Sequence, residues 1–280
     1  MARISRSCFI VADSKFHYST SGPVCRGSIL MPFFPTDRNL SMPKVPALCA
    51  KPANRLLAAL PTAEYQRLLP ELEPVSLAFA QIIYAPGDTI QHVYFPNNSI
   101  VSLLAAEPHH ASLEVGMIGN EGMTGISVFM GVKTSRTLAL VQGSGSAVRM
   151  KAALLRKESD HAGPFHRLLL RYTYSLFTQM SLASACNKFH PLNARLARWL
   201  LMTHDRIGTD EFRLTQEFMS NMLGVRREGV NRAAGELQRG KLVRYSRGQM
   251  AILNRKQLER VSCTCYGIIK ADSDRSLNGG

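Results

Sequence analysis

The chain has 280 residues, 45% of them hydrophobic, and carries 34 Lys and Arg against 20 Asp and Glu, which gives a formal net charge of +14. This composition is typical of a folded protein of one or two domains, and the apolar runs are far shorter than the roughly 20 residues of a membrane span. The charge predicts an acidic partner, most often nucleic acid, and the low density of cysteines excludes a disulfide scaffold and predicts a reducing, cytoplasmic location.

Residues 1–52 contain many prolines and no periodic apolar pattern, so we predict an unstructured extension. The apolar run Cys8–Ala12 is shorter than the core of a signal peptide. Met31 and Met42 leave open a natural start within this segment.

From residue 53 the chain changes to short apolar segments separated by turn residues. After leucines at helical spacing, several segments have the composition of strands: residues 75–84, 92–96, 99–106, 111–118 and 136–142. Turn sequences such as APGD, PNNS, GNEG and GSGS stand between and after them. Strands of this length with such corners predict an antiparallel sandwich or roll that ends near Met150.

A helical period replaces the strand pattern between Pro164 and Lys188. Spacings of three and four predict one helix of about seven turns. Its apolar side is a single stripe, which consists of Leu169, Tyr172, Leu176, Gln179, Ala183 and Cys186. We assign the first five of these residues to a two-fold dimer contact, because residues beside the stripe are also apolar. The alternative is that the stripe packs on the chain's own sheet. A further helix is predicted from Pro191 to Gly208.

Residues 214–240 have the pattern of two short helices joined by a tight turn. Thr215 is a good N-cap, and Met219 and Met222 give the first helix an apolar face. Gly224 can adopt the positive φ of a turn between two helices that cross steeply. The pattern predicts a helix-turn-helix.

In the second helix one face is apolar, at Val230, Ala233, Ala234 and Leu237, which leaves the opposite face free to contact a ligand. That face carries arginine, glutamate and asparagine, the side chains that hydrogen-bond to base edges in the major groove. We therefore predict a DNA-binding set that consists of Thr215, Gln216, Arg226, Arg227, Glu228, Asn231, Arg232, Arg244 and Arg247. Residues 189–262, which contain this set, hold 14 basic and 7 acidic residues, a net charge of +7.

After the second helix, the sequence predicts a hairpin around Ser246–Gly248 whose arginines face the phosphates of DNA. Asn254 is a candidate cap for a final helix. Arg206, Arg255 and Arg260 are expected to be solvated surface charges.

Together these features resemble the CRP/FNR transcription regulators, from about Asn54 to Lys270. The most specific piece is LTQEFMSNMLGVRREGVNR, in which Arg227, Glu228 and Arg232 match the Arg-Glu-x-x-x-Arg that CRP-type members use on a palindromic site. The sequences APGDTIQHVYFPNNSIVSL, EVGMIGNEGMTG and VRYSRGQMAILNRKQLE are similar to a proteobacterial subgroup. The resemblance implies an α+β fold: an N-terminal cyclic-nucleotide-binding-like antiparallel β-roll, a long dimerisation helix and a C-terminal winged helix-turn-helix domain.

The resemblance implies five parts. These are an extension (1–52), a sensor roll (53–162), a dimerisation helix (163–188), a winged helix-turn-helix domain (189–268) and a tail (269–280).

The candidate effector pocket departs from the cyclic-AMP-binding pattern. Members that bind the nucleotide carry Gly-Glu followed by Arg-Ser or Arg-Thr, whereas this chain has Gly125-Ile126 and Arg136-Thr137. The arginine for the phosphate is kept, but the acceptor for the ribose hydroxyl is replaced by isoleucine. Loss of a charged acceptor in a buried pocket weakens binding by about 1.5 to 3 kcal/mol, so cyclic AMP is not expected as the effector.

No cofactor or metal is predicted. The oxygen-sensing branch of the family holds an iron–sulfur cluster with closely spaced N-terminal cysteines, whereas Cys8, Cys25 and Cys49 stand far apart. Cys263 and Cys265 form a weak metal or redox motif, because two ligands do not make a zinc site and the chain has no CxxC partner.

The function implied is that of a homodimeric DNA-binding transcription regulator, whose roll responds to an unknown effector or serves as a scaffold. Its expected partners are palindromic double-stranded DNA, a second copy of the chain and RNA polymerase, with no membrane. The alternative is an effector-binding module that acts through protein contacts without sequence-specific DNA binding. An enzyme is not expected, since the sequence has no nucleophile with a base, paired acids, phosphate loop or HExxH motif.

Overall fold

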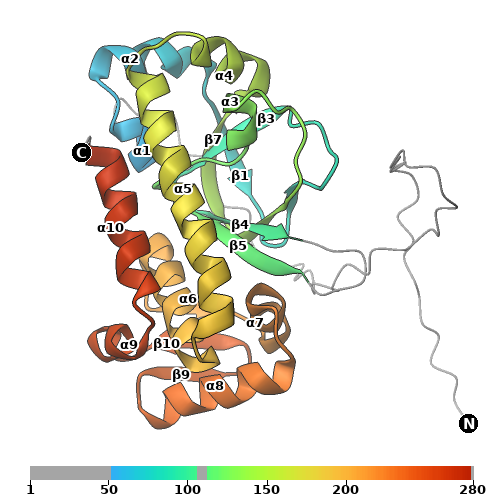
Figure 1. The fold of residues 1–280 in the computed structure, drawn as a ribbon, viewed down its shortest axis with the longest axis vertical. Coiled ribbons are helices and arrows are strands. Elements are labelled where there is room, and N and C mark those ends of the chain that lie inside the picture. Colours follow the sequence, from blue (N-terminus) through green and yellow to red (C-terminus); the bar gives the residue numbers. More distant parts are fainter. Residues whose placement is uncertain (1–51, 106–111, 279–280) are drawn as a thin grey trace, which may run out of the picture.

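The computed structural model of the chain describes residues 52–105 and 112–278. The predictions for residues 1–51 lie outside these ranges. Figure 1 shows a β-roll in the upper part, a helical domain with a small sheet below it, and the long helix α5 (Pro164–Phe189) that runs along both. The predicted α+β fold is confirmed, with a β-roll first, then one long helix and then a helix-turn-helix.

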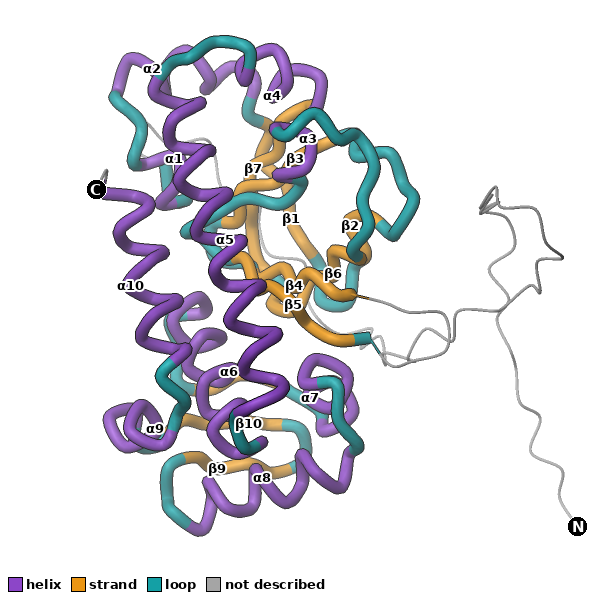
Figure 2. The backbone as a smooth tube through the Cα atoms, in the orientation of Figure 1, coloured by secondary structure: helices purple, strands orange, loops and turns teal. Residues whose placement is uncertain are grey.

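The roll consists of two antiparallel sheets (Figure 2), with the strand orders β1-β7-β3 and β2-β6-β4-β5. The strands are β1 (Glu73–Leu77), β2 (Ile82–Tyr84), β3 (His92–Pro96), β4 (Ile100–Ala105), β5 (Leu113–Ile118), β6 (Leu138–Gly143) and β7 (Gly145–Lys151). Short helices flank them: α1 (Arg55–Ala58), α2 (Thr62–Leu68), the 3-10 turn η1 (Leu69–Glu71), α3 (Ile126–Phe129) and α4 (Ala152–Ser159). Buried Asn54 caps α1 and donates to the carbonyl oxygens of Pro96 and Gly122, so it ties the first helix to the roll.

Most predicted strands of the roll are confirmed, with two differences. The prediction of one strand over residues 75–84 is wrong, because Ala80 adopts a left-handed φ of 62° that separates β1 from β2. Strand β7 is not predicted, because Gly145 and Ser146 have the composition of a turn. Gly145 is required there for space, since a Cβ would lie 2.7 Å from the carbonyl oxygen of Asn98.

Helix α5 turns most of its predicted stripe toward the roll of its own chain, whereas Cys186, near the C-terminal end of the helix, packs in the core shared with the lower domain. The members Leu169, Tyr172, Leu176, Gln179, Ala183 and Cys186 are all buried. The Tyr172 hydroxyl donates to the carbonyl oxygen of Met123 over 2.7 Å, and Gln179 Oε1 accepts from Met117 N over 2.7 Å. The assignment of these residues to a dimer contact is therefore wrong for the described chain, and the alternative of packing on the chain's own sheet holds. The roll covers Leu169, Tyr172, Leu176 and Gln179 because it offers them both apolar surface and backbone hydrogen-bonding groups.

The lower domain has the winged helix-turn-helix order. Its elements are α6 (Leu192–Ile207), β8 (Glu211–Arg213), α7 (Gln216–Leu223), α8 (Arg227–Arg239), β9 (Val243–Ser246), β10 (Gln249–Ile252) and α9 (Arg255–Val261), with the sheet order β8-β10-β9. The predicted end of α6 at Gly208 is confirmed by a left-handed φ of 74°. The predicted Asn254 cap is also confirmed, since its side chain accepts from Gln257 N over 3.0 Å.

The segment predicted as a tail belongs to a helix, α10 (Cys265–Asn278), which runs beside α5 (Figures 1 and 2). Arg171 Nε donates to the carbonyl oxygen of Ser276 over 3.0 Å, and Arg55 forms an ion pair with Asp274 over 2.8 Å. Leu277 is buried in the apolar core of the roll. The C-terminal helix thus connects the lower domain to the upper one.

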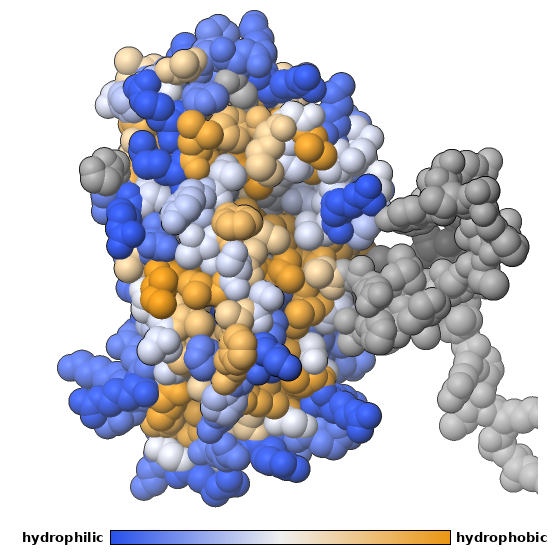
Figure 3. Space-filling view, viewed as in Figure 1, coloured by the Kyte–Doolittle hydropathy of each residue, from blue (hydrophilic) through white to orange (hydrophobic). Residues whose placement is uncertain are grey.

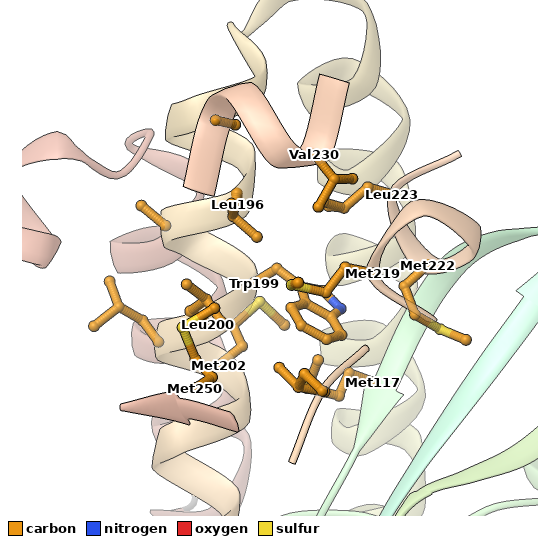
Figure 4. Packing of buried hydrophobic residues seen from close by; sticks show 14 of the residues in the cluster. Met117, Leu196, Trp199, Leu200, Met202, Met219, Met222, Leu223, Val230 and Met250 are labelled. Carbon is orange, nitrogen blue, oxygen red and sulfur yellow. The ribbon is translucent and has the colours of Figure 1, made fainter. Parts of the chain in front are cut away.

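One apolar core crosses the boundary between the two domains. Figure 4 shows Met117, from strand β5 of the roll, beside Trp199 of α6 and Met219 of α7. Trp199 and Met219 are no more than 1% exposed. The roll and the helix-turn-helix are therefore packed against each other in this structure. Within residues 52–105 and 112–278, no helix combines the length and the apolar character that a membrane span requires.

Candidate nucleic-acid interface

The turn between α7 and α8 is fixed by a cap and a glycine. Thr215 Oγ1 accepts from Phe218 N over 3.1 Å at the start of α7. Gly224 follows α7 with φ 62°, the left-handed conformation that glycine adopts without strain. A Cβ at Gly224 would also lie 2.7 Å from Cδ1 of Leu113, which belongs to strand β5. The turn therefore needs glycine both for its conformation and for its close approach to the roll.

Helix α8 buries the face that its sequence predicts. Val230, Ala233, Ala234 and Leu237 are its buried residues. The residues predicted to contact bases, Arg227, Glu228, Asn231 and Arg232, are all exposed, as is Arg226 before the helix. Because the buried face is small and apolar, the helix lies close to its support and projects its polar side chains outward. The structure thus brings the predicted base-contacting set onto one surface.

One predicted residue of α7 is joined to this surface by a hydrogen bond. Gln216 Nε2 donates to Asn231 Oδ1 over 3.0 Å, so the first turn of α7 touches the exposed face of α8. Both Thr215 and Gln216 are partly buried. Their position beside the exposed polar face of α8 suits contacts to the sugar-phosphate backbone, which orient a helix in the groove.

The predicted hairpin is confirmed, and its turn consists of two residues. Arg247 and Gly248 have φ of 48° and 78°, and they connect β9 directly to β10. Two positive φ angles in succession are typical of the turns that match the twist of a tight hairpin. Arg247 is exposed at the tip, whereas exposed Arg244 forms an ion pair with Glu211 over 2.9 Å. Arg244 must exchange Glu211 for a phosphate if it contacts DNA.

Two arginines expected to be solvated are instead paired. Arg206 Nε donates to Glu121 over 2.9 Å, with side chains that are 8% and 11% exposed. Arg255 contacts Asp205 over 2.6 Å and also bonds to the Tyr266 hydroxyl. The surface-charge prediction is wrong for both residues, because each stabilises a contact between elements that are distant in sequence. Arg260 is exposed, as expected.

The candidate effector residues lie on either side of residues 127–135 of the roll. Gly125 has φ 79°, and Ile126 packs against the apolar core of the roll. Arg136 is exposed and Thr137 is partly buried, just before β6. Ile126 thus adds apolar contact where the cyclic-AMP-binding pattern has a carboxylate. A cleft of about 130 Å³ lies elsewhere, between α6 and α10, and Arg206 and Lys270 are among its lining residues.

The contact between roll and winged domain contains interacting residues that the sequence analysis missed. The ring of Phe79, between β1 and β2, lies 5.5 Å from that of Phe218 in α7. Trp199 Nε1 donates to Glu114 over 3.0 Å. Burial raises the pKa of Glu114 to about 7, although hydrogen bonds from Ser102 and Trp199 oppose the shift. No local pattern marks these residues, because their partners lie on different domains.

Comparison with known proteins agrees with this geometry. Residues 194–261 match the model of the Crp-like helix-turn-helix domain. Among curated proteins, none matches the sequence at a significant level.

Solved structures extend the likeness to the rest of the fold. FixK2 from Bradyrhizobium japonicum superposes with a TM-score of 0.60 at 17% identity, covering 69% of this chain and 98% of that protein. The c-di-GMP responsive regulator CLP of Xanthomonas campestris gives 0.56 at 15% identity, covering 69% and 99%. A CRP/FNR transcriptional regulator from Thermus thermophilus gives 0.55 at 18% identity, covering 68% and 98%. At such identities the likeness establishes a shared fold.

Proposed function

We propose that this chain, which carries a Crp-like helix-turn-helix domain on the CRP/FNR fold, is a homodimeric transcription regulator that binds a palindromic DNA site. The observation that carries the proposal is the exposed polar face of α8, where Arg227, Glu228, Asn231 and Arg232 project from an apolar support. It acts in the cytoplasm, with RNA polymerase as a further partner.

The chemistry of the face suits base recognition. Arginine donates to both O6 and N7 of guanine, and glutamate accepts from N4 of cytosine. Arg226 and Arg247 supply phosphate contacts, which contribute affinity that depends on salt but not on sequence. The hydrogen bond from Gln216 orients Asn231, so that the amide nitrogen of Asn231 is free to point toward DNA.

The outer face of α5, which we define as Leu170, Tyr174 and Phe177, supports the dimer. These side chains are 51%, 69% and 67% exposed, and their spacing of four and three places them on one line. Figure 3 shows apolar patches, separated by more polar surface, along the course of α5 on this side of the molecule. Two copies of α5 packed along this face, around a two-fold axis, would bury it. The two α8 helices then have to meet major grooves about 34 to 36 Å apart.

The roll either responds to an effector other than cyclic AMP or serves as a scaffold. Ile126, which packs against the core of the roll, supports this part of the proposal, since its side chain offers no acceptor to a ribose hydroxyl. The alternative, an effector-binding module without sequence-specific DNA binding, leaves the exposed set on α8 without a role.

Selection from a random double-stranded DNA pool tests the proposal. The full-length chain is incubated with the pool at near-physiological salt, with and without cyclic AMP, and bound DNA is sequenced. We expect one palindrome, with half-sites about one helical turn apart, enriched equally in both conditions. Enrichment that requires cyclic AMP would contradict the proposal that the roll responds to another effector or serves as a scaffold. Retention of DNA without any preferred sequence would favour the alternative module.

A further inference from the structure

Four potential metal ligands from two distant parts of the chain meet where α5 ends. Cys186 lies on the last turn of α5, and His190 directly follows that helix. Cys263 lies between α9 and α10, and Cys265 is the first residue of α10. The ligand atoms of these four residues all lie within 4.8 Å of one another. We call this group the Cys3His cluster.

The distances within the cluster suit a single ion. The sulfurs of Cys186 and Cys263 are 3.4 Å apart, and Cys265 Sγ lies 3.7 Å from His190 Nδ1. Around a tetrahedral zinc with Zn–S bonds of about 2.3 Å, the ligand atoms stand about 3.5 to 3.8 Å apart. The space is too small for a multi-iron cluster, whose ligating sulfurs must surround several iron atoms. The ligand atoms lie up to 4.8 Å apart, so a modest shortening of the longest of these distances would complete a tetrahedron.

The surroundings also suit a metal centre. All three cysteines are buried, and no disulfide joins them in the structure. Arg195 and Arg198, two buried arginines of α6, interact electrostatically with the sulfur of Cys186. The Nε atoms of both arginines have no hydrogen-bond partner among the described residues. Three thiolates and a divalent ion leave one negative charge, which these guanidinium groups would offset as outer-shell partners.

We propose that Cys186, His190, Cys263 and Cys265 bind one zinc ion that fastens the C-terminal helix to the joint between α5 and α6. Thiolate and imidazole ligands in a closed tetrahedral set are typical of structural zinc. The ion would hold α10 and the first helix of the winged domain at a fixed position on α5. This assignment does not depend on the proposed DNA binding.

Metal content is the direct test. The full chain is purified anaerobically in reducing buffer, and its zinc content is measured by inductively coupled plasma mass spectrometry. We expect one zinc per chain, lost from Cys186→Ser and from Cys263→Ser. The matched control is the triple variant Cys8→Ser, Cys25→Ser, Cys49→Ser, which removes the other three cysteines of the sequence and should keep its zinc. Zinc that persists in the first two variants would overturn the assignment, as would zinc lost from the control alone.

A titration of the wild-type chain avoids variants that fail to fold. The chain is stripped of metal under reducing conditions and titrated with Co2+, which reports thiolate ligands and tetrahedral geometry by its absorption. We expect saturation at one Co2+ per chain with a sulfur-to-cobalt band, reversed by Zn2+. Absence of that band, or a Cys186–Cys263 disulfide found by peptide mass spectrometry in the anaerobic protein, would replace the metal site with a redox pair.

Discussion

Trp199 Nε1 donates a hydrogen bond of 3.0 Å to Oε1 of Glu114, which joins the first helix of the winged domain to strand β5 of the roll. The second carboxylate oxygen of Glu114 accepts from Ser102 Oγ over 2.7 Å. Burial raises the pKa of this carboxyl to about 7. Its charge therefore changes near neutral pH, in the middle of the contact between the two domains.

The stability of the protein should fall as this carboxyl ionises. A glutamate in the unfolded chain has a pKa of about 4.3, so its folded pKa is raised. The stabilisation that protonated Glu114 contributes to the fold is fully present below the pKa of the unfolded chain, and it is lost as the pH rises through about 7. The expected loss is on the order of 3 kcal/mol. In Glu114→Gln, which keeps an oxygen acceptor for Trp199, the melting temperature should vary less between pH 5 and 8.

The two proteins should have similar melting temperatures near pH 5, and the variant should be the more stable one at pH 8. Glu71→Gln changes an exposed carboxyl and should follow the wild type at every pH. Parallel curves for wild type and Glu114→Gln would show that Glu114 does not titrate in this range.

Local sequence patterns predicted helix α8 and its buried face, whereas the features that the sequence did not predict depend on contacts between residues distant in sequence. The apolar face of α8 follows from periodicity, since Val230 to Leu237 pack on neighbours of the same domain. Helix α5 has two apolar faces, and the spacing alone does not say whether Leu176 or Phe177 meets the sheet. The Cys3His cluster was missed for a similar reason, because its Cys186 and Cys263 are 77 positions apart. Sequence spacing detects ligands on one element, whereas here the fold brings two elements together.

Removing one arginine from the exposed polar face of α8 should reduce discrimination between DNA sequences. We expect Arg227→Ala or Arg232→Ala to cost about 1 to 3 kcal/mol on the selected palindrome and much less on random DNA. Fluorescence anisotropy at a fixed salt concentration measures the affinity for both DNAs. Arg239→Ala removes an exposed arginine from the last turn of the same helix and should weaken binding to the two DNAs equally. Equal losses for all three variants on both DNAs would mean that α8 contacts phosphates only.

Neighbouring residues of α5 should give opposite results when each is changed to glutamate. Phe177 is 67% exposed, so Phe177→Glu places a charge on the outer face without disturbing the core. This variant should yield folded monomers by light scattering. Leu176→Glu buries a charge against the roll, since Leu176 is 5% exposed, and should lower the melting temperature sharply. Val132→Glu alters an exposed apolar residue of the roll and should leave the dimer intact. A dimer that survives Phe177→Glu would place the interface elsewhere.

The buried pair of Arg206 and Glu121 should couple the two domains energetically. Arg206 also donates to the carbonyl oxygens of Met202 and Met117. Loss of its side chain leaves the Glu121 carboxylate buried without its counter-charge. Breaking a buried ion pair by removing one partner costs about 3 to 5 kcal/mol. We therefore expect a loss of that size in the free energy of unfolding for Arg206→Met, measured by urea denaturation.

Neutralising both partners should be less damaging than removing one. In Arg206→Met with Glu121→Gln no charge remains buried, and the glutamine oxygen can still accept from Gly119 N, as Glu121 does over 3.2 Å. The double variant should therefore recover more than about 1 kcal/mol of the single variant's loss. Arg244→Met breaks an ion pair whose side chains are 63% and 71% exposed, and it should cost less than about 1 kcal/mol. If Arg206→Met costs no more than this exposed control, the Glu121–Arg206 contact does not hold the roll on the winged domain.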